Sequence, residues 1–286
     1  MSYLDHISAC NNLEISAFLP FIIDDIPLGL IRRDKIKILR EFNNIFVIGV
    51  NCVTLLHELD DFENRSASVA QVVEKLSLEN EIPMPRREMY PISRDIHYPP
   101  LMQIERVACP FFGFRSFGVH LNGFVRQTDG MYMWIARRSR NKTTYPGMLD
   151  NMVAGGQPFG LGLKENLIKE CGEEAGIPLE ISRNVRPVGV IMYDHQSAEG
   201  AKPDRQYCFD LELTENFRPV AVDGEVEEFM LWPLHQVAEI VHKTFEFKFN
   251  CNLVIIDFLI RHGYLDADNE ANYTDICKGL RKESVI

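Results

Sequence analysis

The stretch GGQPFGLGLKENLIKECGEEAGI, residues 155–177, combines a glycine-rich loop with a helical pattern. The pattern predicts a helix from about Leu163 to Ala175, closed at its C-terminus by Gly176. Gly155 and Gly156 lie just upstream, and residues without a side chain allow the backbone to approach a ligand closely. We therefore take this loop and helix as the centre of the fold and of the candidate site.

Three carboxylates of the predicted helix share one face. Glu170, Glu173 and Glu174 stand at positions i, i+3 and i+4, so they project within about one helical turn. Like charges at this spacing destabilise a helix by roughly a few tenths of a kcal/mol per pair. Hard divalent cations such as Mg²⁺ prefer carboxylate oxygens and bridge to phosphates, and a bound cation would relieve the repulsion. The competing interpretation is an ordinary acidic face exposed to solvent.

The overall composition is that of a globular protein. The 286 residues are 46% hydrophobic and 25% charged, which is enough chain for one large or two modest domains. A formal net charge of −11 argues against a nucleic-acid binder or a protein of anionic membranes, because both need a basic surface. An acidic protein that binds a phosphate ester needs positive charge at the site, from basic side chains or a metal.

Cysteine usage and the absence of targeting signals predict a cytoplasmic protein. The seven cysteines have no C-x-x-C spacing, so we expect neither a disulfide framework nor a structural zinc site. The first residues carry no basic-then-apolar signal pattern. The longest apolar run, 253–260, is interrupted by Asp257 and is too short to cross a bilayer.

The first part of the chain predicts a separate α+β domain, residues 1–105. Ser66 stands where the N-cap of an amphipathic helix would lie, and residues 46–50 have the pattern of a buried strand. A proline-rich passage, residues 82–101, predicts a loop or linker. We place the domain boundary near residue 105.

Residues 106–286 predict a second domain of the α/β class. Two strands flank a turn at Asp129-Gly130, and further strands alternate with helices. The expected strands are 117–125, 132–137, 187–193, 207–213 and 228–232, and the expected later helices begin at Pro233 and at about Asn250. Strands mixed with helices on both sides in sequence favour an α/β sandwich.

The segment 155–177 resembles the Nudix box, which is Gly, five residues, Glu, seven residues, then Arg-Glu-hydrophobic-x-Glu-Glu-x-Gly-hydrophobic. Gly155 matches the first glycine, and the closing half matches in register at Glu170, Cys171, Glu173, Glu174, Gly176 and Ile177. Two positions depart: Leu161 stands at the first Glu and Lys169 at the Arg. In the family these two residues brace the loop against the helix, so both ends of the brace are changed. The resemblance implies an α/β/α sandwich with a mixed sheet.

Other segments are similar to one Nudix branch, related to the Nudix domains fused to thiamine pyrophosphokinase in some fungi. The N-terminal unit also resembles the leading domain of that branch. The segments that carry the likeness are 119–123, 134–139, 145–151, 153–156, 223–227 and 247–251.

The resemblance implies hydrolysis of a small organic diphosphate, with thiamine diphosphate or its oxidised analogues as the substrate of this branch. Glu170, Glu173 and Glu174 would hold Mg²⁺ (or Mn²⁺), which activates water for in-line attack on phosphorus. Glu174, Glu173 and Glu225 are the catalytic candidates. Glu225 belongs to a second acidic cluster with Glu227 and Glu228, and Asp223-Gly224 would present it at a turn.

Several other residues are candidates for binding the substrate. Gly155 and Gly156 would approach it through their backbone, and Arg137 and Arg138, followed by Lys142, would offset the charge of the diphosphate. His120 and Asn122 alternate on a strand and share a face, so they either line the pocket or form a structural pair. His195 is either an acid–base group or a neutral surface histidine.

Alternative functions remain open at this level. The domain could be specific for another nucleoside diphosphate derivative, such as a nucleotide sugar or a dinucleotide. The changes at Leu161 and Lys169 also motivate a binding module without turnover. An isomerase of isopentenyl diphosphate is a further alternative. The N-terminal domain either completes the substrate pocket or only stabilises the chain, and the oligomeric state is open.

Overall fold

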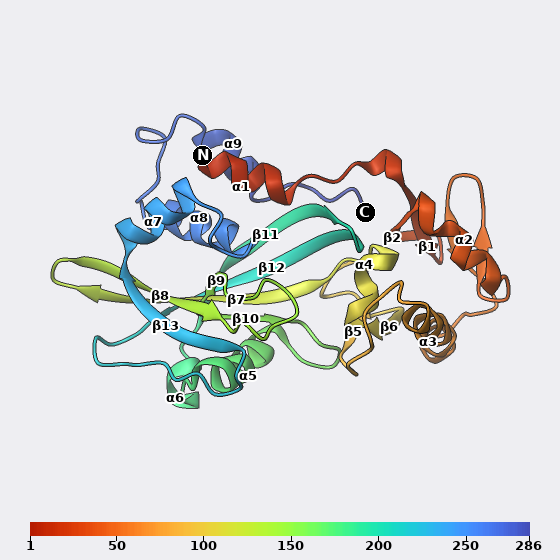
Figure 1. The fold of residues 1–286 in the computed structure, drawn as a ribbon, viewed down its shortest axis with the longest axis horizontal. Coiled ribbons are helices and arrows are strands. Elements are labelled where there is room, and N and C mark those ends of the chain that lie inside the picture. Colours follow the sequence, from red (N-terminus) through yellow and green to blue (C-terminus); the bar gives the residue numbers. More distant parts are fainter.

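A mixed seven-stranded sheet organises the C-terminal part of the chain in the computed structural model, which describes residues 1–286 (Figure 1). The strands follow the order β11-β12-β7-β8-β13, with β10 paired to β7 and β9 paired to β8. Only β12 and β7 are parallel, and the other neighbours in this sheet are antiparallel. The strand bounds are β7 Phe117–Gln127, β8 Gly130–Arg138, β9 Leu149–Asn151, β10 Val153–Gly156, β11 Arg186–Ser197, β12 Gly200–Glu212 and β13 Val226–Pro233.

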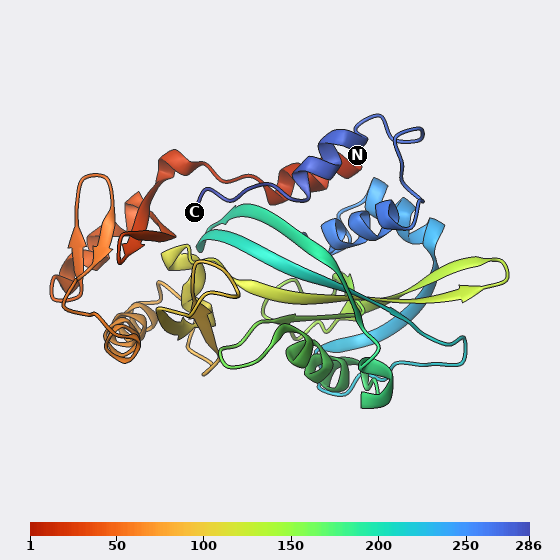
Figure 2. The same ribbon diagram turned by 180° about the vertical axis from the view of Figure 1, so that it is seen from behind.

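Helices cover both faces of this sheet, as Figures 1 and 2 show from opposite sides. Side chains of β7 alternate between the two cores: Val119 packs with Leu167 of α5, and Phe124 packs in the core that contains Phe258 of α8. The predicted α/β/α sandwich with a mixed sheet is therefore confirmed. The helices are α5 Leu163–Ala175 and α6 Leu179–Ser182 on one face, and α1 Tyr3–Cys10, α7 Leu234–Lys243, α8 Cys251–Arg261 and α9 Tyr273–Gly279 on the other.

The N-terminal unit is a smaller α+β assembly with a hydrophobic core of its own. Its four-stranded sheet has the order β2-β1-β4-β3, and β5 and β6 form a separate antiparallel pair. The strands are β1 Phe18–Ile23, β2 Ile26–Arg32, β3 Phe46–Ile48, β4 Val53–Leu55, β5 Met89–Ile92 and β6 Met102–Glu105. The helices are α2 Ile36–Leu39, α3 Phe62–Leu78 and α4 Cys109–Phe112, with 3-10 turns at Ile15–Ala17, Arg33–Lys35, Arg40–Phe42 and Arg106–Ala108.

Helix α3 starts earlier than we predicted. Its N-cap is Asp61, whose carboxylate accepts a hydrogen bond of 2.7 Å from the backbone N–H of Asn64. Ser66, the predicted N-cap, lies inside the helix and donates to the Phe62 carbonyl at 2.7 Å. The prediction was wrong because both residues are capping types and the aspartate lies one turn upstream.

The proline-rich passage 82–101 contains strand β5 and is not only a loop. Pro91 lies within this strand, opposite Gln103. A proline is tolerated there because a two-stranded pair leaves one edge of each strand without a partner. The strand expected at 46–50 is shorter and ends at Ile48.

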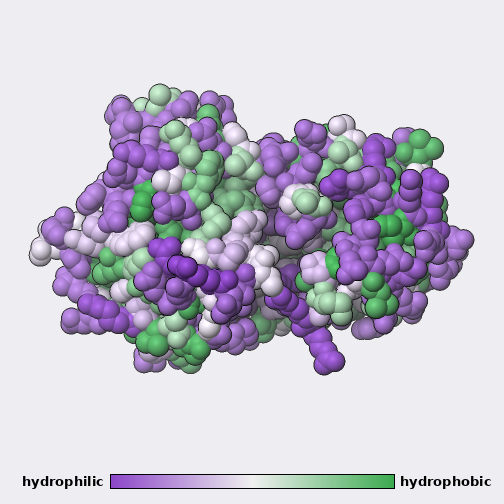
Figure 3. All heavy atoms as spheres, viewed as in Figure 1, coloured by the Kyte–Doolittle hydropathy of each residue, from purple (hydrophilic) through white to green (hydrophobic).

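The two units are more closely joined than a division at residue 105 suggests. The N-terminal core includes Phe111, Phe112 and Phe114, beyond that position. Conversely, Tyr3 and Ile7 of α1 belong to the core that also contains residues of α7, α8 and α9, and α1 lies beside α9 (Figure 1). In the space-filling view the surface is mainly hydrophilic, and a furrow runs between the two halves (Figure 3). All the helices are too short or too polar to span a membrane.

Candidate active site

A cavity of about 490 Å³ lies between the start of β7, strand β10, helix α5 and the N-terminal unit. Glu170, Glu173 and Glu174 of α5 all line it. Helix α5 has the predicted bounds, and Gly176 ends it in a left-handed conformation with φ of 59°. The local pattern of the sequence thus places three carboxylates at one cavity.

The three carboxylates differ in burial and partners. Glu174 is 8% exposed, and its carboxylate accepts a hydrogen bond of 3.1 Å from the N–H of Ala154. Burial raises the pKa of Glu174 well above its ordinary value, and the charges of Asp150, Glu170 and Glu225 raise it further. Burial also raises the pKa of Glu170. Because these oxygens repel one another at the cavity wall, a cation would be attracted there.

Gly155 and Gly156 allow the close packing of β10 at the cavity. A Cβ atom at Gly155 would lie 2.7 Å from Cγ of Glu170, so α5 approaches the strand more closely than a side chain would permit. A Cβ atom at Gly156 would lie 1.4 Å from the hydroxyl of Tyr90, which comes from β5 of the N-terminal unit. Both glycines are required here by close approach.

The loop between β10 and α5 is held by amide side chains, which the sequence analysis missed. Asn166 donates to the carbonyl of Gly156 at 2.8 Å, and Gln157 donates to the carbonyl of Leu161 at 2.6 Å. Lys169 instead pairs within its own helix, at 3.3 Å from Glu170 and 2.5 Å from Glu173. The bond of Asn166 therefore joins the helix to the start of the loop without a Glu–Arg brace.

Of the second acidic cluster, only Glu225 lines the cavity, whereas Glu227 and Glu228 do not. Glu225 lines the cavity and forms an ion pair with Lys142, which also lines it. Glu227 pairs with Arg140 at 3.6 Å and Glu228 pairs with Arg137 at 2.9 Å, and none of these residues belongs to the cavity wall. The structure thus brings Glu225 together with the carboxylates of α5.

The remaining predicted residues are partly at the cavity. Arg138 and His120 line it, whereas Arg137 and Asn122 do not. Arg137 faces Glu228 because consecutive residues of β8 point to opposite sides of the sheet. Asn122 shares a face with His120 but lies further along β7, where it donates to Asp210 at 3.1 Å.

His195 also lies away from the cavity wall. It stacks on Phe249, with the ring centroids 4.7 Å apart, and its Nδ1 lies 3.2 Å from the carbonyl oxygen of Ala9. These contacts give it a packing role between β11 and α1.

A buried network of charged groups adjoins the cavity and was not predicted. His120, Asp150 and Cys251 place their ligand atoms within 4.8 Å of one another. Burial opposes the charge of Asp150, but Lys248 at 3.8 Å and Arg138 at 2.7 Å lower its pKa to about 2. The Cys251 thiol donates to Asp150 at 2.7 Å, and burial raises the pKa of this thiol. Since Asp150 already has two cationic partners, this cluster is balanced without a metal.

A second polar group lies where β11 and β12 reach the cavity. Tyr193 donates to Asp204 at 3.2 Å and accepts hydrogen bonds from Gln206 at 3.2 Å and Asn250 at 3.3 Å. Burial raises the pKa of Asp204 to about 6. This end of the cavity is therefore polar.

Two family models match consecutive parts of the chain. Residues 2–116 match a domain of unknown function (DUF4743), and residues 117–253 match the NUDIX domain. The junction lies at the start of β7, after the last phenylalanines of the N-terminal core.

Curated relatives are similar over nearly the whole chain. "Nudix hydrolase 20, chloroplastic" and "Nudix hydrolase 24, chloroplastic" of Arabidopsis thaliana are each 41% identical to it, over 98% of this chain and 77% of theirs. "Uncharacterized protein YJR142W" of Saccharomyces cerevisiae is 34% identical, over 84% of this chain and 75% of its own length. In all three relatives the likeness spans both units.

Proposed function

The chain belongs to the Nudix hydrolases, and we propose that it hydrolyses a small organic diphosphate to the monophosphate and phosphate in a metal-dependent reaction. The observation that carries the proposal is that Glu170, Glu173 and Glu174 all line one cavity beside Gly155 and Gly156 of β10. A diphosphate in this cavity would meet the carboxylates through a cation and the glycine backbone directly.

The carboxylates of α5 suit a divalent cation by their chemistry, although the ligand atoms that the structure gathers within 4.8 Å belong to His120, Asp150 and Cys251. Their donor set consists of hard oxygen atoms, which Mg²⁺ and Mn²⁺ prefer. The ammonium of Lys169 already lies between Glu170 and Glu173, which indicates that positive charge is stabilised at this position. We assign Glu170, Glu173 and Glu174 as the metal ligands, and the cation would neutralise the diphosphate and activate a water molecule.

The protein's own groups contribute position and charge. Glu174 is held by the N–H of Ala154, so its carboxylate has a fixed orientation at the cavity. We propose that Glu174 and Glu173 are catalytic and that Glu225, which also lines the cavity, orients water or accepts its proton. The ion pair with Lys142 holds Glu225 at the cavity surface.

Substrate contacts are proposed for the predicted residues that line the cavity. These residues are Gly155, Gly156, Arg138 and His120. Arg137 and Asn122 are left out because their side chains are bonded elsewhere, to Glu228 and Asp210 respectively.

For the substrate itself, we propose thiamine diphosphate or one of its oxidised analogues, on the basis of the branch resemblance alone. A nucleoside diphosphate derivative is the second candidate. The polar end at Asp204 and Gln206 would accept the nitrogen-bearing ring of either class. We propose a small-molecule substrate and no nucleic acid, since the net charge is −11.

The cytoplasmic location stays a prediction. The two plant relatives are named chloroplastic, so the comparisons give it no support.

The deciding experiment is an activity screen with Mg²⁺ present and after its removal by a chelator. Thiamine diphosphate and its oxidised analogues are compared with nucleotide sugars and dinucleotides, and the released phosphate is measured. Release that depends on Mg²⁺ supports the hydrolase. Binding without turnover across the panel would favour a binding module, and rearrangement of isopentenyl diphosphate without phosphate release would favour an isomerase.

Glu174→Gln tests the assigned role of the carboxylate. We expect the metal-dependent kcat to fall by more than about 100-fold, because a neutral amide is a poor ligand for a hard cation. The fold should be retained because the amide has the same shape and can still accept the Ala154 hydrogen bond. Glu180→Gln is the matched control, since Glu180 is exposed on α6 and outside the cavity wall. Unchanged turnover in Glu174→Gln would refute the role.

A further inference from the structure

The N-terminal unit forms one wall of the active-site cavity. Tyr90 of β5 packs its hydroxyl against Gly156, where a Cβ atom would lie only 1.4 Å away. In the next part of the same loop, the N–H of Phe159 donates to the carbonyl of Met89 at 2.8 Å. The loop that leads into the catalytic helix is thus held by a segment of the N-terminal unit.

This wall also brings a basic side chain whose charge is not balanced. Most basic residues of the cavity form ion pairs with a carboxylate: Arg106, Arg138, Lys142, Lys202 and Lys248. Arg86 is also at the cavity but forms no ion pair, and its exposed guanidinium only donates a hydrogen bond of 3.4 Å to Oγ of Thr143. Arg86 is therefore the permanent positive charge in the cavity that remains free for an anion.

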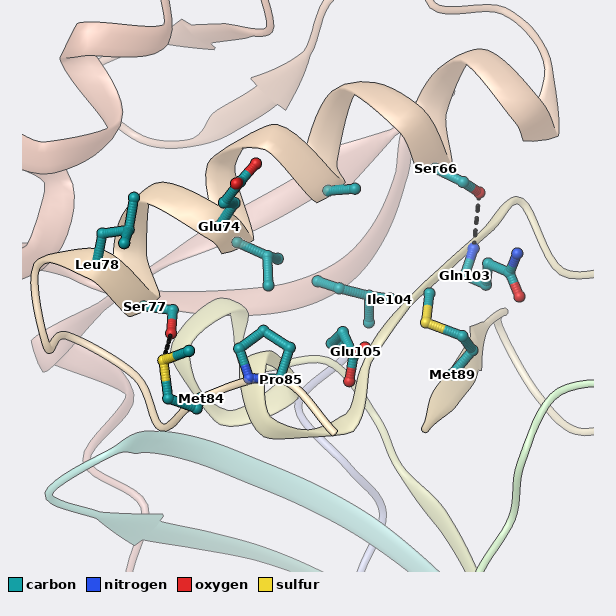
Figure 4. A pocket seen from close by; sticks show the side chains of 12 residues that line it. Ser66, Glu74, Ser77, Leu78, Met84, Pro85, Met89, Gln103, Ile104 and Glu105 are labelled. Carbon is teal, nitrogen blue, oxygen red and sulfur yellow. Dashed lines mark hydrogen bonds between the residues drawn. The ribbon is translucent and has the colours of Figure 1, made fainter. Parts of the chain in front are cut away.

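The backbone at Arg86 is held in place by hydrogen bonds to the side chain of Glu105. The carboxylate of Glu105 accepts hydrogen bonds from the N–H groups of Arg86 at 3.2 Å, Arg87 at 2.9 Å and Glu88 at 3.3 Å. Glu105 and Pro85 lie close together at the edge of a second, mostly apolar cavity of about 380 Å³ beside α3 (Figure 4). Because the turn is held in this way, Arg86 can bind a ligand at a lower entropic cost.

Arg86 lies on the side of the cavity that Glu225 occupies. Its partner Thr143 follows Lys142, which is paired with Glu225. The charge of Glu225 contributes to the raised pKa of both Glu170 and Glu174, so Glu225 is near the carboxylates of α5. An anion held by those carboxylates through a cation would extend towards this side.

We propose that the N-terminal unit is part of the substrate site and that Arg86 binds a phosphate oxygen of the diphosphate. The inference rests on the proposed function, because it assumes an anionic diphosphate in this cavity. A guanidinium suits this role, since its planar donors match phosphate oxygens. The role belongs to binding, and Arg86 takes no part in the chemical step.

Arg86→Gln tests the proposal in the full-length protein, with Arg87→Gln as the matched control. Arg87 is the adjacent exposed arginine, lies outside the cavity wall and loses the same charge. We expect Arg86→Gln to raise the KM for the hydrolysed diphosphate about tenfold with kcat nearly unchanged, because one charge-assisted bond is lost from both substrate and transition state. Arg86→Lys should restore part of the loss, and Arg87→Gln should stay within about twofold of the wild type.

A second measurement separates this proposal from the hydrolase itself. Calorimetry measures the Kd of inorganic diphosphate in the presence of Mg²⁺. We expect this Kd to rise about tenfold in Arg86→Gln and to stay unchanged in Arg87→Gln. Equal KM and Kd values for the two variants would overturn the role of Arg86 while leaving the hydrolase intact. If the wild type binds diphosphate but turns over no substrate, the proposed function fails and the binding data alone decide on Arg86. A wild type that neither binds nor turns over would overturn both.

Discussion

Individual side chains at the cavity are held in unusual electrostatic states by their burial. His120 is 2% exposed, and burial, together with the charge of Lys248, lowers its pKa to about 4. Its Nδ1 atom lies 2.9 Å from the side-chain oxygen of Asn151, so the neutral ring is held in place. Asp150, next to this wall, stays ionised because Lys248 and Arg138 balance it. A neutral imidazole next to a balanced carboxylate leaves the negative charge of the cavity concentrated at α5.

The buried state of His120 predicts a pH-dependent stability. The unfolded chain takes up this proton with a pKa of about 6.5, whereas the folded protein resists it until about pH 4. The unfolded state therefore binds more protons as pH falls through this window, and the folded protein loses stability. Between pH 7.5 and 5, the wild type should lose about 2 kcal/mol more unfolding free energy than His120→Gln.

Urea unfolding at the two pH values measures this difference. His235→Gln is the control, because His235 is exposed on α7. If the unfolding free energy changes equally between the two pH values in the wild type and in His120→Gln, His120 does not contribute to the pH dependence.

At the scale of elements, helix α5 depends on where its glycines lie. Gly176 ends the helix at φ of 59° and allows the chain to turn towards Ile177, which packs in the core with Leu167. Gly172 lies within the helix, and a Cβ atom there would meet no other atom within 4 Å. The two glycines of one helix therefore have opposite consequences for stability.

Alanine substitutions at these positions should change stability in opposite directions. Gly176→Ala should lower the free energy of unfolding by about 1–2 kcal/mol, because a Cβ is strained in the left-handed region. Gly172→Ala should raise it by about 0.5–1 kcal/mol, since it removes backbone freedom from the unfolded chain without a clash. Chemical denaturation measures the free energy of unfolding of both variants. A lower value for Gly172→Ala than for the wild type would contradict the open space at that position.

For the whole molecule, the two units are interdependent. Helix α1 belongs to the C-terminal core, where Ile7 is 5% exposed and shares the hydrophobic core with Cys251 and Phe258 of α8. In return, β5 of the N-terminal unit holds the loop before α5. Unfolding either unit would therefore disturb the proposed active site.

Ile7→Ala tests this coupling. Loss of a buried isoleucine should cost about 2–5 kcal/mol of unfolding free energy, although residue 7 precedes the NUDIX domain by more than a hundred positions. Ile15→Ala, at a side chain that is 49% exposed, should change it by no more than about 0.5 kcal/mol. Thermal or urea unfolding measures both variants. An equal loss of unfolding free energy in Ile7→Ala and Ile15→Ala would show that α1 does not belong to the core.

The sequence alone determined the features that depend on near neighbours in the chain. The helix 163–175, its terminating Gly176, the turn at Asp129-Gly130 and the shared face of the three glutamates all follow from backbone preferences and helical periodicity. Only the tertiary structure decided which partners these groups meet. Three features join segments that are far apart in sequence: the contact of Tyr90 with Gly156, the position of Arg86 beside Thr143, and the packing of α1 in the C-terminal core. Such contacts depend on side-chain packing and burial, which local sequence patterns do not predict.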